Sequence, residues 1–149
     1  MSLNLTAIEP IHAEVLAALH PYCFAEPWKT EAFTNLLQTP GTFGLLALEN
    51  DIPAGFVVLR AAADEAEMLT IGIHPEHRRK GIAAKMLEAV NRAAAERGVA
   101  SLFLEVAEDN PGAIAFYEQA GYEETGRRAK YYKRRRGDRV DALLLTKSV

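Results

Sequence analysis

The sequence predicts an α/β fold in which about four helices flank a mixed central β-sheet of about six to seven strands. Two observations predict it. Short β-prone runs and helical runs follow one another in the order β-α-α-β-β-β-α-β-α-β-β. Some β runs are joined by turns and others by helices, and hairpins give antiparallel pairs whereas helical connections allow parallel ones.

The composition indicates one globular domain over residues 1–149. Hydrophobic residues make up 49% of the chain and charged residues 25%, and no repeat or Gly/Ser linker interrupts it. No apolar run approaches the ~20 residues of a membrane helix. The lone cysteine, Cys23, excludes an internal disulfide and fits a reducing compartment. We expect a cytoplasmic monomer or weak dimer with no membrane partner.

The first third of the chain reads as one strand and two short helices. Leu5 to Ile8 is β-prone, and apolar residues at helical spacing follow from Ile11 to Leu19. Pro21 ends this helix. Thr30, as N-cap, is expected to begin a second helix that runs to Leu37 and stops at Pro40-Gly41.

Three strands are predicted next. Phe43 to Leu48 and Ala54 to Arg60 are apolar runs, and Glu49-Asn50-Asp51 between them indicates a hairpin. Glu67 to His74 is the third.

The central helix and the elements after it have clear end signals. The long helix has a buried stripe and ends at Gly98, and Ser101 to Val106 is the next strand. Asn110 and Pro111 supply an N-cap and an N1 proline for a helix through about Gln119, which Gly121 terminates. The stripe of the long helix consists of Ile82, Met86, Leu87, Val90 and Ala94.

The closing strands are predicted at Tyr122 to Gly126 and Ala142 to Thr146. Between them, Arg127 to Arg139 contains eight basic residues and one acid, Asp138, although the whole chain has a net charge of −3. A mildly acidic body with one basic segment indicates a local anion-facing surface and not a general nucleic-acid binder.

The loop Arg78-Arg79-Lys80-Gly81-Ile82-Ala83 joins a predicted strand to the long helix. A glycine loop that opens a helix turns several backbone N–H groups toward one point, where the helix N-terminus adds partial positive charge. Such a concavity can hold a pyrophosphate. The spacing matches neither GxxxxGK[ST] nor GxGxxG. A solvated basic turn that caps a helix is the alternative.

Three motifs in one order carry a family resemblance. They are Leu69–His74 with Arg78-x-x-Gly81-x-Ala83, then Leu104-Glu105-Val106-x-x-x-Asn110, then Ala115-Phe116-Tyr117-x-x-x-Gly121-Tyr122. Together they resemble the GNAT superfamily of acetyl-coenzyme A-dependent N-acetyltransferases, from Phe43 onward. The resemblance implies a GNAT-like fold and an acyltransferase that uses acetyl-CoA.

Within that superfamily the chain is similar to the RimI type, which acetylates the N-terminal amine of a ribosomal protein. Pro27-Trp28, Arg127-Arg128-x-x-Tyr131-Tyr132 and Gly137-Asp138-Arg139-x-Asp141-Ala142 carry this likeness. The run Lys133–Arg136 departs from it by being more basic. The implied acceptor is a peptide or protein N-terminus, with a ribosomal protein as the leading candidate and no direct nucleic-acid partner. The alternatives are a GNAT enzyme for a small amine and an RNA- or ribosome-binding module whose CoA site is regulatory.

The resemblance implies that Glu105 is the catalytic base and Tyr117 the general acid. In its strand Glu105 shares a face with Phe103, opposite Leu104, and a carboxylate inside an apolar strand is costly unless it is wet, paired or functional. The alternatives are an edge carboxylate or a buried ion pair for Glu105, and plain packing for Tyr117. An α-amine has a pKa near 8, against about 10.4 for the lysine side chain. It is therefore deprotonated more easily at neutral pH and needs a weaker catalytic base.

The resemblance also implies how the ligands bind. Backbone N–H groups of residues 79–84 would hold the pyrophosphate, and the side chains of Arg78 and Arg79 would either contribute or simply be solvated. The 71–73 strand would pair with the pantetheine arm. Trp28, Tyr131 and Tyr132 would line the acceptor groove, or simply pack. The predicted cofactor-binding residues are Ile71, Ile73, Arg78, Arg79, Lys80, Gly81, Ile82, Ala83, Ala84 and Asn110.

Two other chemistries are not supported. Cys23 could carry an acetyl group covalently, but it has no histidine neighbour in sequence and is interpreted as a small buried hydrophobe. His74 and His77 lack partners at zinc-ligand spacing, so no metal is assigned. Direct transfer in a ternary complex is therefore expected.

Overall fold

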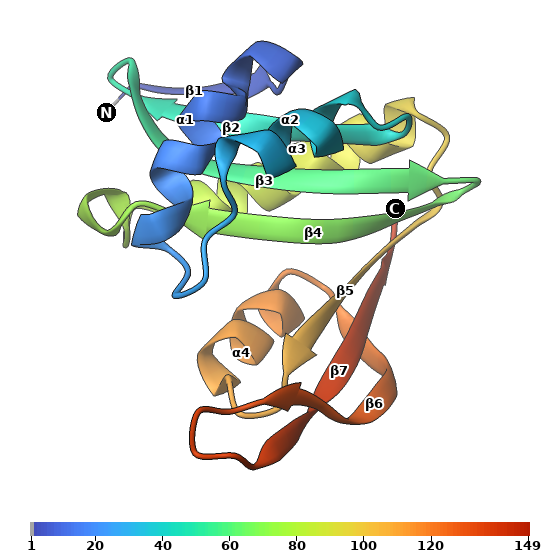
Figure 1. The fold of residues 1–149 in the computed structure, drawn as a ribbon. Helices are drawn as coiled ribbons and strands as arrows, with labels where there is room; N and C mark the ends of the chain where they lie inside the picture. Colours follow the sequence, from blue (N-terminus) through green and yellow to red (C-terminus); the bar gives the residue numbers. More distant parts are fainter. Residues whose placement is uncertain (1) are drawn as a thin grey trace.

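The computed structural model describes residues 2–149 and contains seven strands and four α-helices in the order that the sequence predicts (Figure 1). Short 3-10 turns lie at Pro10–His12, His20–Tyr22 and Pro75–His77. In chain order the strands and helices are β1 (Leu3–Ala7), α1 (Ala13–Leu19), α2 (Thr30–Gln38), β2 (Thr42–Glu49), β3 (Ile52–Ala62), β4 (Glu65–Ile73), α3 (Ile82–Glu96), β5 (Ser101–Ala107), α4 (Pro111–Gln119), β6 (Glu123–Lys133) and β7 (Arg139–Ser148).

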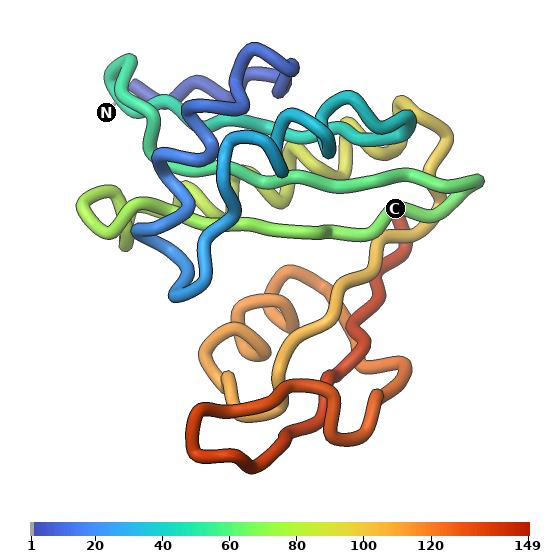
Figure 2. The backbone as a smooth tube through the Cα atoms, viewed as in Figure 1, coloured from blue at the N-terminus to red at the C-terminus, as the bar shows by residue number. Residues whose placement is uncertain are grey.

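The strands form one mixed sheet in the order β1-β2-β3-β4-β5-β7-β6. Of these strands, β4 and β5 pair in parallel and the other neighbours pair antiparallel. The parallel pair needs the crossover through α3, whereas turns are enough for the hairpins. Figure 2 shows the end of the chain beside the junction of β4 and β5.

Two apolar layers hold the helices to the sheet. Figure 1 shows α1 and α2 on one face of β1–β4 and α3 on the other. Leu16 and Phe33 pack with Phe56 under α1 and α2. Val57 belongs to the larger core, which α3 covers and which extends to β5, β7 and α4. Because successive residues of β3 face opposite layers, this strand is apolar on both faces.

The turn and helix signals of the sequence are mostly confirmed. Asn50 and Asp51 have φ values of 50° and 67°, as a two-residue hairpin turn of the primed type requires. The predicted stripe of α3 is fully buried. The predicted cap of α2 is wrong: Lys29 holds the capping position, with the extended backbone that it needs, and Thr30 is the first helical residue.

The last two strands are much longer than predicted. The basic segment 127–139 forms most of β6, the turn and the start of β7. All but two residues of β6 are exposed, so this edge strand lacks the alternation of apolar and polar residues by which a half-buried strand is recognised. Its pairing with β7 is interrupted between Arg128 and Tyr132, where Lys130 has a φ of 50°.

No helix within residues 2–149 is long and apolar enough to span a membrane.

We expect Phe56→Ala to lower the free energy of unfolding by about 3–5 kcal/mol, because it empties a fully buried site between β3 and the α1–α2 layer. Urea denaturation followed by circular dichroism measures the change. Ile52→Ala is the control in the same strand, since Ile52 is 56% exposed, and its effect should stay within about 0.5 kcal/mol. Similar losses in both variants would contradict this description of the core.

Candidate active site

The two halves of the sheet separate where β5 leaves β4. The strands pair over only three positions, from Glu65 with Ser101 to Glu67 with Phe103. Beyond that point β5 turns away together with β7 and β6 (Figure 1). The β4 backbone from Met68 onward therefore has no β5 neighbour and presents N–H and C=O groups to the space between the strands.

A cleft of about 250 Å³ opens at this separation. Its lining includes Ile71 from β4, Glu105 from β5, Asn110 from the β5–α4 connection and Tyr117 from α4. The structure thus brings together one predicted strand residue, the predicted base, the predicted acid and the predicted asparagine.

A second hollow, of about 380 Å³, lies at the phosphate-loop end of β4. Arg79 and Gly81 have φ values of 64° and 76°, and Gly81 immediately precedes the 15 residues of α3. Left-handed positions next to a helix N-terminus turn backbone N–H groups toward a common concavity. This donor set fits a pyrophosphate. The predicted cofactor residues that line the hollow are Ile73, Arg78, Arg79, Gly81, Ile82, Ala83 and Ala84.

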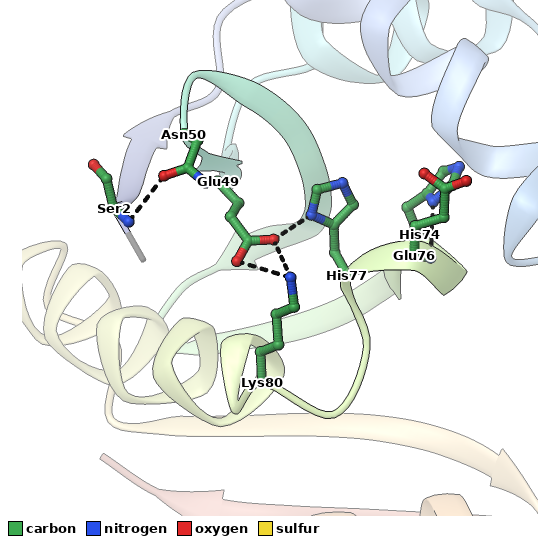
Figure 3. Close-up of polar contacts among 7 residues, drawn as sticks. All are labelled: Ser2, Glu49, Asn50, His74, Glu76, His77 and Lys80. Atoms are coloured by element: carbon green, nitrogen blue, oxygen red, sulfur yellow. Dashed lines mark hydrogen bonds and ion pairs between the residues drawn. The ribbon is translucent and has the colours of Figure 1, made fainter.

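The side chain of Lys80 binds a buried carboxylate. Its Nζ donates to Oε1 and Oε2 of Glu49, at 2.9 and 3.2 Å, and the Nδ1 atom of His77 contacts the same carboxylate (Figure 3). Glu49 is only 4% exposed at the end of β2. Hydrogen bonds from Lys80 and then His77 hold the pKa of Glu49 below its usual range. Through them, Glu49 attaches the loop to the β2–β3 hairpin.

Of the other two basic side chains of the loop, one is hydrogen-bonded to another described residue and the other is not. Arg78 Nε donates to the carbonyl oxygen of Ile73 at 2.9 Å, which folds Arg78 back onto β4. Arg79 has no side-chain partner within residues 2–149. Of the three predicted cations, Arg79 is therefore the one whose side chain is not already paired within the part of the chain that the structure describes.

Glu105 lies where the sequence predicts, on the face of β5 opposite the buried residues Leu104 and Val106. Its side chain is 16% exposed, and its Oε1 atom forms an ion pair with Arg128 Nε at 3.0 Å. Glu105 also lines a third hollow, of about 430 Å³, which covers the outer face of β5, β7 and β6. This carboxylate is therefore reached from the cleft and from the third hollow.

Tyr117 forms the wall of the cleft on the α4 side. It is 9% exposed, and its ring packs edge-on against those of Phe116 and Tyr122. Burial raises the pKa of Tyr117 to about 12. Its hydroxyl therefore stays protonated at neutral pH and can donate a hydrogen bond into the cleft.

The structure separates the two predicted roles of Asn110. Its Oδ1 accepts from the Ala113 backbone N–H at 3.2 Å, which confirms the N-cap of α4. The side-chain amide nitrogen has no partner among the described residues. The oxygen can therefore cap the helix while the nitrogen faces a ligand.

The three predicted acceptor residues lie outside the 250 Å³ cleft. Trp28 is 37% exposed in the segment between α1 and α2. Tyr131 and Tyr132 lie on β6 with ring centroids 5.1 Å apart. The guanidinium of Arg128, which pairs with Glu105, lies 5.2 Å from the centre of the Tyr131 ring, so this pair of rings borders the predicted base. Burial, and then the charge of Glu105, raises the pKa of Tyr132.

Sequence reasoning missed several residues of this region. Phe24 and Thr70 line the cleft. Arg128 pairs with Glu105, and Glu49 with Lys80, across 23 and 31 positions of the chain. Phe24, four residues before Trp28, could have been noticed from its place near the Pro-Trp pair. No local sequence pattern indicates the roles of Thr70, Arg128 and Glu49.

Cys23 does not have the properties of a nucleophile. Its Sγ atom donates to the Ile73 carbonyl oxygen at 3.5 Å, and burial raises the pKa of its thiol. Within residues 2–149, no three His, Cys, Asp or Glu side chains are grouped so that they could hold a metal ion.

Comparison with known proteins agrees with this geometry. The model of the acetyltransferase (GNAT) family matches residues 13–122. The [ribosomal protein bS18]-alanine N-acetyltransferase of Escherichia coli K12 is 33% identical over 121 residues, which span 81% of this chain and 80% of that relative. The probable N-acetyltransferase san of Drosophila melanogaster is 31% identical over 153 aligned positions, 99% of this chain and 82% of that relative.

A solved structure is similar to this protein over nearly the whole chain. The ribosomal-protein-S18-alanine N-acetyltransferase of Escherichia coli superposes with a TM-score of 0.91, at 28% identity, over 99% of this chain and 94% of that one.

We expect Glu49→Gln to lower the thermal midpoint at pH 7, because Lys80 and His77 lose the carboxylate that they share. A carboxyl group with a lowered pKa stabilises the fold above its unfolded pKa of about 4.3, and this contribution disappears as the pH falls through that region. The difference between variant and wild type should therefore shrink below about pH 4. Glu76→Gln, an exposed change in the adjoining turn, is the control and should leave the midpoint in place. A difference that persists undiminished in acid would contradict the assignment.

Proposed function

The chain belongs to the acetyltransferase (GNAT) family, and from this premise we propose that it acetylates the N-terminal α-amine of a protein by direct transfer from acetyl-CoA. The enzyme class, N-acetyltransferase, and the acetyl donor, acetyl-CoA, follow from the family. A ribosomal protein is the proposed acceptor, since the relative at 33% identity is named for ribosomal protein bS18. The observation that best supports the reaction is that Glu105 and Tyr117 line one cleft.

The chain offers a continuous set of groups for coenzyme A. Backbone N–H groups of residues 79–84 would hold the pyrophosphate, and the free edge of β4 at Ile71 to Ile73 would pair with the pantetheine arm. The free amide nitrogen of Asn110 would donate to that arm. When bound, the cofactor supplies a thioester whose carbonyl carbon accepts the amine. An N–H group of the β4 edge would polarise the thioester oxygen.

We assign Glu105 the removal of the proton from the acceptor amine. At neutral pH an α-amine with a pKa near 8 is about 10% neutral, so one carboxylate, acting directly or through a water, is sufficient help. The arriving ammonium group replaces the Arg128 guanidinium at Oε1 or uses the second oxygen of the carboxylate. Once the nitrogen is neutral, it attacks the carbonyl carbon and the C–N bond forms.

We assign Tyr117 the stabilisation of the leaving sulfur. With a pKa of about 12, its hydroxyl is a weaker acid than a thiol, whose pKa is about 8.5. A hydrogen bond from Tyr117 to the sulfur as the C–S bond breaks is therefore the larger part of its action. The ammonium group gives up two protons in all, one to Glu105 before the attack and one after the C–N bond has formed; one of them ends on the free thiol and the other in the solvent.

The acceptor would arrive through the 430 Å³ hollow, because Glu105 borders both this hollow and the cleft. Donor and acceptor then reach the reacting atoms from different sides, as a ternary complex requires. Tyr132, near Glu105, and Tyr131 beside it are placed to contact the first residues of a peptide.

We expect Glu105→Gln to lower kcat/KM at neutral pH by about 10²–10⁴-fold, the usual contribution of a positioned base. The affinity for acetyl-CoA, measured by calorimetry, should stay unchanged. Glu108→Gln is the control, since Glu108 is 38% exposed and pairs with Arg127 instead of lining the cleft. Wild-type turnover by the Glu105→Gln variant would remove this carboxylate from the mechanism.

Tyr117→Phe should lower kcat with little change in either KM, whereas Tyr122→Phe, which removes a buried hydroxyl that has no partner among the described residues, should leave kcat intact. Equal effects of the two would assign Tyr117 a packing role only.

The acceptor is tested by incubating the enzyme with acetyl-CoA and a ribosomal-protein extract, followed by mass spectrometry of intact proteins and their N-terminal peptides. We expect one acetyl group on the α-amine of one ribosomal protein. Acetylation confined to added small amines such as spermidine would overturn the protein acceptor. No turnover together with RNA binding that weakens steeply with salt would favour the binding-module alternative.

A further inference from the structure

A buried histidine lies beside the cleft and takes no part in the reaction described above. His20 begins the 3-10 turn that follows α1 and is 2% exposed. Its ring is enclosed by aromatic rings from three other parts of the chain. They are Phe24 at 4.3 Å and Trp28 at 5.1 Å, both stacked on it, Phe33 of α2 at 5.2 Å and Phe56 of β3 at 5.5 Å.

Both ring nitrogens are hydrogen-bonded, and the bonds define the tautomer. The backbone N–H of Trp28 donates to Nδ1 at 2.9 Å, so Nδ1 carries no proton. The proton of the neutral ring is therefore on Nε2, which lies 3.1 Å from Thr70 Oγ1 and donates to it. The Thr70 hydroxyl remains free to donate in turn.

His20 holds both ends of the segment between α1 and α2. Its carbonyl oxygen accepts from the N–H groups of Cys23 and Phe24, each at 3.0 Å, and its ring accepts from Trp28. Through Nε2 the same residue is attached to Thr70 of β4. Phe24 and Thr70 both line the cleft that contains Glu105. One side chain thus fixes the segment against the strand that carries the free edge.

We propose that His20 is a positioning residue for the acceptor: its neutral ring holds segment 22–28 so that Phe24 forms one wall of the cleft beside Glu105, and its protonation releases that wall. The proposal rests on the proposed function insofar as the segment faces an amine acceptor. It does not depend on whether that acceptor is a ribosomal protein.

Protonation disrupts the arrangement for a simple reason. Imidazolium has two N–H donors and no acceptor, so a proton on Nδ1 would face the N–H of Trp28. Burial already lowers the pKa of His20, which keeps the ring neutral near pH 7. A histidine with a lowered pKa in the fold gives its full contribution above its unfolded value of about 6.5. That contribution is lost as the pH falls below this value, so the wall should loosen in mild acid.

The rings packed on His20 include no second histidine, but one other histidine contacts the segment: the His74 ring lies 4.3 Å from that of Tyr22. The His20 variants below separate the contribution of His74 from that of His20. The rings from the segment, α2 and β3 do not titrate, and β4 contributes the hydroxyl of Thr70. The titratable side chains of the segment itself are Tyr22, Cys23, Glu26 and Lys29, of which all but Cys23 are exposed. Burial raises the pKa of the Cys23 thiol, away from acid.

The chain carries its own reporter, because Trp28 is the single tryptophan and stacks on the His20 ring. We expect its fluorescence to change in one step with a midpoint below about pH 6.5 when the free enzyme is titrated from about pH 8 to about pH 5, while the far-UV circular dichroism stays native. This measurement uses no acceptor, so it is unaffected if the acceptor assignment is wrong. Emission that is constant over this range would overturn the proposal.

Two variants and a control assign the step to His20. His20→Asn keeps an acceptor for the Trp28 N–H but cannot titrate, so the fluorescence step should disappear. His20→Phe fills the space without an acceptor, and its emission should resemble the acid form at every pH. His12→Asn is the matched control: His12 Nδ1 also accepts a backbone N–H, from Glu9 at 2.9 Å, but outside the aromatic cluster. A step that persists in His20→Asn or is lost in His12→Asn would contradict the proposal.

Steady-state kinetics separates positioning from general stability. Between about pH 7.5 and about pH 5.5 the KM for the acceptor should rise by about two- to tenfold more in the wild type than in His20→Asn, as for the loss of one hydrogen bond, while the KM for acetyl-CoA stays constant. The comparison with His20→Asn cancels the protonation of the acceptor amine itself. A parallel rise in both KM values would indicate a merely structural role.

The ¹⁵N resonances of the wild-type His20 ring provide a check without any variant. At about pH 8, where the ring is neutral, they should show an unprotonated Nδ1 and a protonated Nε2, and the opposite pattern would overturn the hydrogen-bond assignment.

Discussion

The separation of β5 from β4 is the feature on which the rest of the site depends. Parallel pairing ends after Glu67 and Phe103, and from there the backbone of β4 has no neighbour on that side. An unpaired strand edge inside a fold is costly unless something else satisfies its N–H and C=O groups. The same separation opens the cleft that Glu105 and Tyr117 both line. Ligand affinity and catalytic geometry therefore have one structural origin.

In the loop before α3, the charged side chains and the backbone N–H groups have different roles. Its sequence is conspicuous for three consecutive cations, yet Lys80 is held by the buried Glu49 and Arg78 by the Ile73 carbonyl. These contacts restrain the residues on either side of the left-handed Arg79, and the second of these residues, Lys80, also precedes the left-handed Gly81. Part of the positive charge thus maintains the shape in which backbone N–H groups converge, which a flexible side chain could not do alone.

Local patterns explain which parts were predictable. The stripe of α3, the alternation of β5 around Glu105 and the capping of α4 by Asn110 are encoded within a few residues of each other. The edge strand β6 was predicted too short because its exposed, charged residues have no apolar period. The contacts of Glu49 with His77 and of His20 with Thr70 could not be predicted, since the partners lie 28 and 50 positions apart and only the fold brings them together.

The position of β7 in the sequence has a consequence for the order in which the protein folds during its synthesis. After leaving β4, the strand that bears Glu105 has β7 as its neighbour, and β7 spans Arg139–Ser148, near the end of the chain. During synthesis, about forty further residues must therefore be added before β7 is available to pair with β5. The layer around β1–β4 and α3 can collapse earlier, because all of its elements precede β5 in the chain and β2, β3 and β4 are joined by hairpins. The half-molecule that carries the loop before α3 should thus mature before the half that carries Glu105, the proposed base, and a nascent chain would remain inactive until β7 has paired with β5.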